Sequence, residues 1–221
     1  EKPVELVPPL GLLGTAEDYR FGSFAAYRKA VDAAGVAVNV AALAGHGTLR
    51  AMTLEDTDAP ASAGQIAAMR VLLEEALEAG VLGLSTGLAY PVARHAPTDE
   101  VVALSQTLAA FPGALYVTHM RDERDRVEES VGETIAIGRR AGVPVVISHH
   151  KCIGRHNYGR SKKTLSMIDS ALRHQDIAMD VYPYEASSTV LLPELTRHAE
   201  RILIIDSAAH PEFNGLELSK V

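Results

Sequence analysis

Histidines stand directly after two apolar runs that have the composition of buried β-strands. His119 follows ALYVT at 114–118, and His149 and His150 follow VVIS at 145–148, one strand-helix repeat further on. Neutral imidazole is a good ligand for Zn2+, and catalytic zinc keeps one position open for water. A single histidine at a strand end is more often a polar residue satisfied by its neighbours. Taken together, the strand-end histidines support a metal site and a structural role about equally.

Further polar residues follow the same strand or the next one. Lys151 comes directly after the histidines and could hold an anionic substrate group, or could be a surface charge paired with a carboxylate. Tyr182, Tyr184 and Ser188 lie in the stretch DVYPYEASST, where their hydroxyls could orient a substrate carboxylate or amide. The alternative for these three residues is a turn that packs the strand end. We expect most of the mixed-sign run RDERDR at 121–126 to be solvated.

Alternating helices and strands would have to position these residues. Capping residues, helix formers and stop signals predict helices at residues 23–34, 62–79, 98–110, 126–141 and 161–174. Apolar, β-branched runs predict strands at residues 36–43, 81–86, 114–119, 143–149 and 177–182. Strands separated by helices must be parallel neighbours, either in a doubly wound open sheet or in a (β/α)8 barrel. No glycine-rich phosphate-binding motif follows any strand, which disfavours the nucleotide-binding open sheet.

The polar residues gather at one end of the predicted strands. Those that could do chemistry at successive carboxyl ends are His46, Ser85, Thr86, His119, His149, His150, Lys151, Tyr182 and Tyr184. In a parallel barrel these ends form one rim, where the active site lies. We therefore expect the imidazoles of His119 and His149 to project from adjacent strands toward a common point.

The composition of the chain excludes several classes of protein. It has 221 residues, of which 47% are hydrophobic, and a formal net charge of -7. This acidic balance argues against nucleic acid as a partner, because phosphate binding requires an excess of Lys and Arg. No run of about 18 uncharged apolar residues predicts a transmembrane helix, and the N-terminal EKPVELVPPL has no signal-peptide core. Cys152 is the one cysteine, so we expect a reducing, cytoplasmic location and a space-filling thiol.

Five collinear motifs together resemble the D-aminoacylase (N-acyl-D-amino-acid deacylase) family of the amidohydrolase superfamily. They are GLSTGLAY at 83–90, YVTHMRDE at 116–123, VISHHKC at 146–152, NYGRS at 157–161 and DVYPYEASSTVL at 180–191. The stretch NVAALAGHGTLR at 39–50 fits the same family. Motifs of this length in one order are far more specific than any one of them, and the resemblance covers almost the entire chain.

The resemblance implies a fold, an activity and a set of site residues. The fold is a partial (β/α)8 TIM-type barrel, about strands three to seven, over residues 1–190, followed at 191–221 by the start of an insertion that precedes the last barrel strand. The implied activity is zinc-dependent hydrolysis of the amide bond of N-acyl-D-amino acids, which makes a small molecule the substrate. The residues that match the family are His119 and His149 as zinc ligands, Lys151, Tyr182 and Ser188 as substrate-carboxylate contacts, and Tyr90 in the specificity pocket.

Two considerations select His149 rather than His150 as the second ligand. The family spacing fits the first histidine of the pair. Alternation along a strand would also place Val145, Ile147 and His149 on one face.

The chain departs from the family pattern in three places. The family's H-x-H pair and its metal-ligand cysteine would precede Glu1, and its catalytic aspartate would follow Val221. We therefore expect an internal fragment of a longer enzyme that lacks deacylase activity by itself.

Two other functions stay open at this point. A cyclic amidase of the hydantoinase type is disfavoured because such enzymes use a carboxylated lysine on the fourth barrel strand, and VLGLST at 81–86 has no lysine. A non-catalytic βα-repeat protein that binds a small anion is the other alternative. Metal content separates this alternative from the enzyme, because an anion-binding protein needs no metal.

Overall fold

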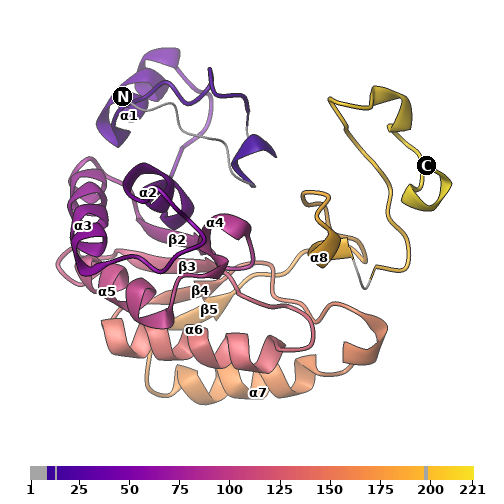
Figure 1. Ribbon diagram of the computed structural model, residues 1–221. Helices are drawn as coiled ribbons and strands as arrows, with labels where there is room; N and C mark the ends of the chain where they lie inside the picture. Colours follow the sequence, from indigo (N-terminus) through magenta and orange to yellow (C-terminus); the bar gives the residue numbers. More distant parts are fainter. Residues whose placement is uncertain (1–8, 13, 197–198) are drawn as a thin grey trace.

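A parallel sheet of five strands forms the centre of the computed structural model, which describes residues 9–12, 14–196 and 199–221 (Figure 1). The strands are β1 Ala44–Gly45, β2 Gly83–Gly87, β3 Leu115–His119, β4 Val145–Ile147 and β5 Ile177–Met179. They lie in the order β1-β2-β3-β4-β5, so each strand pairs with the next one along the chain. A doubly wound sheet would reverse its order at a switch point. The sequential order therefore confirms the partial barrel of the TIM type.

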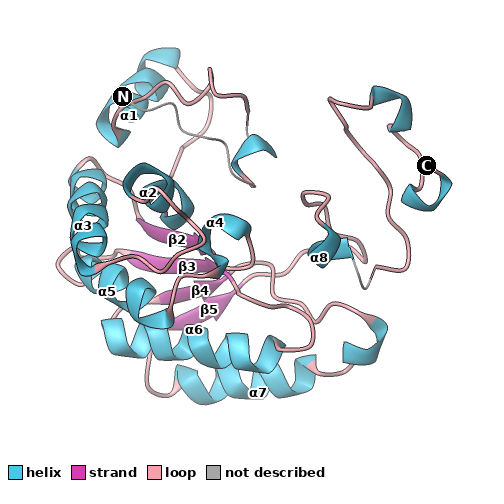
Figure 2. Ribbon diagram, viewed as in Figure 1, coloured by secondary structure: helices cyan, strands magenta, loops and turns pink. Residues whose placement is uncertain are grey.

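Helices connect the strands and cover the outer face of the sheet (Figure 2). The α-helices are α1 Phe24–Ala34, α2 His46–Thr53, α3 Ala63–Glu78, α4 Pro91–Arg94, α5 Thr98–Leu108, α6 Val127–Ala141, α7 Ser161–Leu172 and α8 Pro193–Thr196. Short 3-10 helices lie at Leu10–Leu12, Arg155–Asn157, Pro211–Phe213 and Leu218–Lys220. Successive helices α3, α5, α6 and α7 pack side by side, as in the outer ring of a barrel. Within the described part of the chain, no helix is both long and apolar enough to span a membrane.

Local capping explains why the predicted helices begin and end close to the expected residues. The Ser23 side chain accepts a hydrogen bond from the amide of Ala26 at the start of α1. Ser62 and Gln65 form a reciprocal capping box at the start of α3. Gly35 and Gly142 end α1 and α6 in the left-handed conformation, at φ values of 63° and 70°. The helices α2 and α4 were not predicted.

The strand predicted at residues 36–43 is wrong. This segment has no regular structure, and β1 comprises Ala44–Gly45 alone. The valines that made the segment look like a buried strand are exposed, with 72% of the surface of Val38 accessible. Backbone pairing with the β2 side begins at Ala42, whose carbonyl accepts from the Leu82 amide at 2.8 Å. An apolar run becomes a buried strand only where the fold supplies packing on its faces, and β1 lies at the edge of the sheet.

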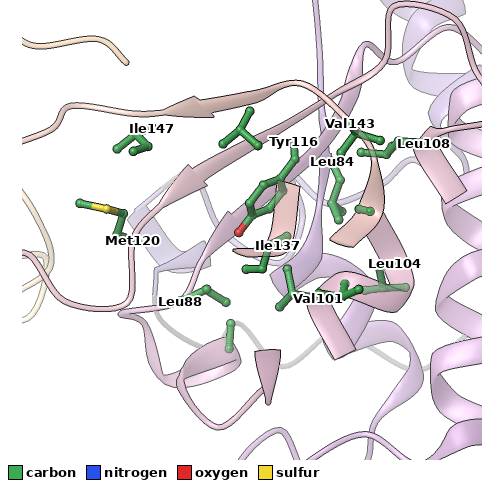
Figure 3. Packing of buried hydrophobic residues seen from close by; sticks show 14 of the residues in the cluster. Leu84, Leu88, Val101, Leu104, Leu108, Tyr116, Met120, Ile137, Val143 and Ile147 are labelled. Carbon is green, nitrogen blue, oxygen red and sulfur yellow. The ribbon is translucent and has the colours of Figure 1, made fainter. Parts of the chain in front are cut away.

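The hydrophobic core lies between the sheet and the helices (Figure 3). Leu84, Tyr116 and Ile147 project from three strands and are fully buried against Leu104 and Ile137 and their neighbours on the helices. The alternating burial of β3 places Tyr116 and Thr118 on this side and leaves His119 on the other. The sheet therefore presents its less crowded face, away from the helices, to the candidate site.

Candidate metal centre

The imidazoles of His119 and His149 meet at the carboxyl ends of β3 and β4. His119 Nδ1 lies 2.9 Å from His149 Nε2, and the two rings are inclined at 71° with their centroids 4.5 Å apart. Together with a carboxylate oxygen of Glu123 they form a group whose ligand atoms lie within 4.8 Å of one another. No other set of three such side chains gathers in this way among residues 9–12, 14–196 and 199–221. The distance between the ring nitrogens agrees with the expectation that His119 and His149 project toward a common point.

The protonation of this group suits a divalent metal. Burial lowers the pKa of His119 to about 4, an effect larger than the opposing attraction of Glu123. At neutral pH His119 is therefore uncharged and keeps a lone pair for a ligand, as metal binding requires. Two facing imidazole nitrogens are ligands that zinc accepts, and the Glu123 carboxylate lies beside the second imidazole as its support. The residues present thus fit a zinc ion.

His149 reaches this position through an unusual backbone conformation. Its φ of 41° makes it the one non-glycine residue with a positive φ in the part of the chain that the structure describes. Regular alternation would place His149 with Val145 and Ile147, which are buried on the helix side of the sheet. The shared-face argument for His149 is therefore wrong, because β4 ends at Ile147 and the chain turns before the histidine. The turn carries the imidazole to the face that holds His119.

Glu123 is the residue of this group that the sequence did not reveal. It lies in the mixed-sign run at 121–126, yet only 4% of its surface is accessible. Its carboxylate oxygen lies 2.9 Å from His149 Nδ1 and accepts from Lys151 Nζ at 2.8 Å. Burial opposes ionisation, but the hydrogen bond with His149 and the charge of Lys151 outweigh it and hold the pKa of Glu123 below its usual value. The residues between His119 and Glu123 form no helix, so no spacing rule distinguished Glu123 from the other charges of the run.

The ring of His149 is oriented with Nε2 toward His119 and Nδ1 toward Glu123 and Lys151. The ammonium of Lys151 can only donate, and it has acceptors in Glu123 and in the carbonyl of His149, each at 2.8 Å. Nδ1 of His149 lies 2.8 Å from that ammonium and 2.9 Å from Glu123. Donation from Nδ1 to Glu123 is the tautomer that leaves the Nε2 lone pair directed toward His119. A carboxylate that fixes a histidine tautomer in this way is the usual support of a metal-ligating imidazole.

Three of the four predicted substrate-binding residues lie around this group. Lys151 Nζ is 5.4 Å from the centre of the Tyr182 ring. The ring of Tyr90 packs 4.9 Å from that of His119, centroid to centroid. Ser188 is exposed, and among the described residues no hydrogen bond joins it to Lys151 or Tyr182. Its neighbour Thr189 instead approaches Tyr90, with the hydroxyl oxygens 3.5 Å apart.

Several polar residues expected at the rim lie elsewhere. His46 is the first residue of α2 and is fully buried, with Nε2 2.9 Å from Glu100. Thr86 points into the core, where its hydroxyl bonds to those of Tyr116 and Thr118. The expectation of a rim position for His46 and Thr86 is therefore wrong, because α2 begins at the end of β1 and because Thr86 lies on the helix side of β2.

Cys152 packs against the core, and burial raises the pKa of its thiol, which agrees with a space-filling role.

The strand order and the group at the carboxyl edge define a barrel-type α/β fold with a candidate metal centre. The chain is similar to a crystal structure of D-aminoacylase, an amidohydrolase, with a TM-score of 0.94, 42% identity, and coverage of 100% of this chain and 47% of that chain. It is also similar to the N-acyl-D-glutamate deacylase of Bordetella bronchiseptica solved with zinc and a phosphonate inhibitor, with a TM-score of 0.93, 40% identity, and coverage of 100% and 46%.

Curated relatives agree with the solved structures. The N-acyl-D-aspartate deacylase of Alcaligenes xylosoxydans xylosoxydans is 44% identical over 217 residues, which are 98% of this chain and 44% of the relative. The D-aminoacylase of the same organism is 45% identical over 213 residues, which are 96% and 44%. No general protein-family profile matches the chain. The chain is thus similar to D-aminoacylases over nearly all its length, as its motifs indicated, and it spans somewhat less than half the length of the curated relatives it matches.

Proposed function

We propose that this chain supplies the zinc-binding and carboxylate-binding part of an enzyme that hydrolyses the amide bond of N-acyl-D-amino acids. The observation that carries the proposal is the 2.9 Å approach of His119 Nδ1 to His149 Nε2 beside a buried carboxylate. It occurs in a chain that is 40–45% identical to deacylases over nearly all its length. His119 and His149 would hold the ion, and when bound it would polarise the scissile carbonyl and lower the pKa of a bound water to about 7.

The side chains around the metal group would select the substrate. The Lys151 ammonium is held by Glu123 and by the His149 carbonyl, and 20% of its side chain is exposed. A substrate carboxylate could approach that exposed part and gain a charge-assisted hydrogen bond. Tyr182 lies beside Lys151 and would add its hydroxyl. Ser188, in the same segment of the chain, is the third proposed contact. Holding the carboxylate on one side determines which enantiomer presents its amide to the metal.

Tyr90 is the residue that would contact the amino-acid side chain. Its ring lies against His119, and its hydroxyl approaches Thr189 from the segment that follows β5. This position joins the metal group to the DVYPYEASSTVL motif. We propose on this basis that Tyr90 lines the specificity pocket.

The proposal divides the chain into a barrel part and a C-terminal segment. We assign residues 1–190 to the barrel and residues 191–221 to the beginning of an insertion. The support is that residues 199–221 pair among themselves, through a Leu203–Glu217 bridge and an Ile204 amide bond to Leu216 at 3.0 Å. In Figure 1 this segment, yellow, lies apart from the sheet. We also propose a cytoplasmic location and a small-molecule substrate for the intact enzyme.

A chimaera tests the proposed activity. Residues 1–221 replace the matching segment of the Alcaligenes D-aminoacylase, which is 45% identical to them. The chimaera is expected to release free D-amino acids from their N-acetyl forms when loaded with zinc. A folded chimaera that binds zinc without hydrolysing any of a panel of N-acetyl-D-amino acids would contradict the proposal. If the whole exchange does not fold, exchanging residues 83–191 alone transfers the same site residues.

Lys151→Met in the chimaera is expected to raise the KM for an N-acyl-D-amino acid about tenfold or more. The reason is the loss of a charge-assisted contact with the substrate carboxylate, which stabilises by about 1.5–3 kcal/mol. An amidated substrate has no carboxylate, so its KM should change much less. Lys162→Met on the exposed side of α7 is the matched control. Equal losses on both substrates would mean that Lys151 acts only by supporting Glu123.

Glu123→Gln is expected to lower the zinc affinity of the 221-residue chain about 10–100-fold, the usual loss when the partner of a metal-ligating histidine is replaced. Glutamine has nearly the same shape but bears no charge to hold Nδ1–H and the Lys151 ammonium. Competition with a chromophoric chelator measures the affinity. Glu129→Gln, at an exposed position on α6, serves as the control and should leave the affinity unchanged. A zinc affinity of Glu123→Gln equal to that of the wild type would show that Glu123 does not support zinc binding.

A further inference from the structure

We infer that Asp180 is a positioning residue that fixes the left-handed turn at His149 and so directs its imidazole toward His119. The inference rests on the proposed metal site. It assigns a role to a residue at the end of β5 that is neither a ligand nor a contact of the substrate. The argument depends on backbone hydrogen bonds between β4 and β5.

Regular pairing of β4 stops one residue before the turn. The Ser148 amide still donates to the Thr118 carbonyl at 3.0 Å, in register with β3. His149 then takes its φ of 41°, a conformation that residues other than glycine seldom adopt. An extended His149 would follow the alternation of Val145 and Ile147 into the helix side of the sheet, where both are almost fully buried. Without the turn, His149 would be a buried residue of the core. With it, the imidazole of His149 lies beside His119.

Asp180 holds the turn from the neighbouring strand with two acceptors. Its Oδ1 accepts the His149 amide at 2.6 Å, and its backbone carbonyl accepts the following amide, of His150, at 2.8 Å. The Lys151 ammonium binds the His149 carbonyl at 2.8 Å. Both backbone polar groups of His149 are thus held, one by Asp180 and one by Lys151. A strained conformation persists where surrounding contacts over-determine it in this way.

The hydrogen bond to Asp180 is the part of this arrangement that a side-chain substitution can remove. The carbonyl of Asp180 serves His150 whatever its side chain, whereas only the carboxylate reaches the His149 amide. Asparagine keeps an oxygen acceptor at the same distance from the backbone, and alanine removes it. Asp180→Asn should therefore preserve the turn, and Asp180→Ala should release it. Comparing the two variants shows whether the turn depends on the oxygen acceptor of Asp180 or on its negative charge.

The test compares Asp180→Ala, Asp180→Asn and the wild-type 221-residue chain. Asp176→Ala, at an exposed position just before β5, is the matched control. Zinc affinity is expected to fall about tenfold or more in Asp180→Ala and to recover in Asp180→Asn. In the metal-free chain, NMR should show a downfield amide proton for His149 and a contact between the two imidazole rings. Both signals should vanish in Asp180→Ala and return in Asp180→Asn.

The outcomes separate this inference from the proposed metal site. Retention of the ring contact and of wild-type zinc affinity in Asp180→Ala would overturn the positioning role and leave the metal site intact. A wild-type chain that binds no zinc would overturn the metal site, while the ring contact would still decide the role of Asp180. Should Asp180→Ala not fold, Asp180→Glu takes its place, because the extra methylene displaces the acceptor. Unchanged ring contacts in that variant would count against the inference.

Discussion

Replacement of His149 by alanine is expected to lower the zinc affinity of the chain about a hundredfold or more, and His119→Ala should do the same. Each substitution removes one of the two nitrogens that face each other at 2.9 Å. A structural or catalytic zinc site normally needs at least three protein ligands, so the one remaining imidazole would hold the ion only weakly. Isothermal titration with zinc and metal analysis of the purified chain measure the loss.

The control for these substitutions is His174→Ala. His174 is exposed just beyond α7, and its loss should leave zinc binding unchanged. Zinc that stays bound at wild-type affinity in the double variant of His119 and His149 would show that the metal lies elsewhere. That result would contradict the assignment of His119 and His149 as zinc ligands. A wild-type chain that takes up no zinc would instead favour the alternative of a βα-repeat protein that binds a small anion without a metal.

Arg50→Met is expected to reduce the free energy of unfolding by about 3–5 kcal/mol, because it leaves a carboxylate buried without its partner. Arg50 and Glu100 are both fully buried, and the guanidinium donates to the two carboxylate oxygens at 2.6 and 2.8 Å. Its remaining donors bind three carbonyls, those of Val92, Thr57 and Ala59. Urea denaturation followed by circular dichroism measures the change.

An exposed ion pair of similar geometry provides the comparison. Arg140 and Asp99 lie 2.7 Å apart, with 47% and 80% of their side chains accessible. Arg140→Met should cost about 1 kcal/mol or less, because exposed pairs contribute little. The double variant Arg50→Met/Glu100→Leu should recover part of the loss, since it removes the stranded charge. A stability of Arg50→Met within about 1 kcal/mol of the wild type would contradict this account of the cluster.

The regular part of the fold could be predicted because its signals are local. The capping residues Ser62 and Gln65 and a run of strong helix formers predict helix α3. Helix α6 ends at Gly142, which adopts the left-handed conformation. The strands β2 to β5 follow as apolar runs at even intervals. The predicted strand at 36–43 failed because its valines have the composition of a strand, while burial depends on neighbours that composition does not specify.

The site was predicted less completely because it lies where regular structure ends. His119 follows the alternation of β3, so its face could be predicted. His149 is found by family spacing, but its orientation depends on a single positive φ that no pattern of side chains predicts. Glu123 looks like one charge among six until the fold buries it beside His149 and Lys151. The predicted rim position of His46 failed for a related reason, because the residues around it gave no signal that α2 begins at this histidine.

The strand order β1-β2-β3-β4-β5 has a consequence for how the chain folds. Leu115 pairs with Gly83, and Ile177 pairs with Val145, so every ladder joins segments that are consecutive repeats. Each pairing must close a loop that contains a whole helix, and parallel sheets form slowly for this reason, but no pairing skips a repeat. The sheet can therefore grow by adding one repeat at a time. His119 and His149 come from two such consecutive repeats, so an ion between them would cross-link a growing sheet before its last described strand is in place.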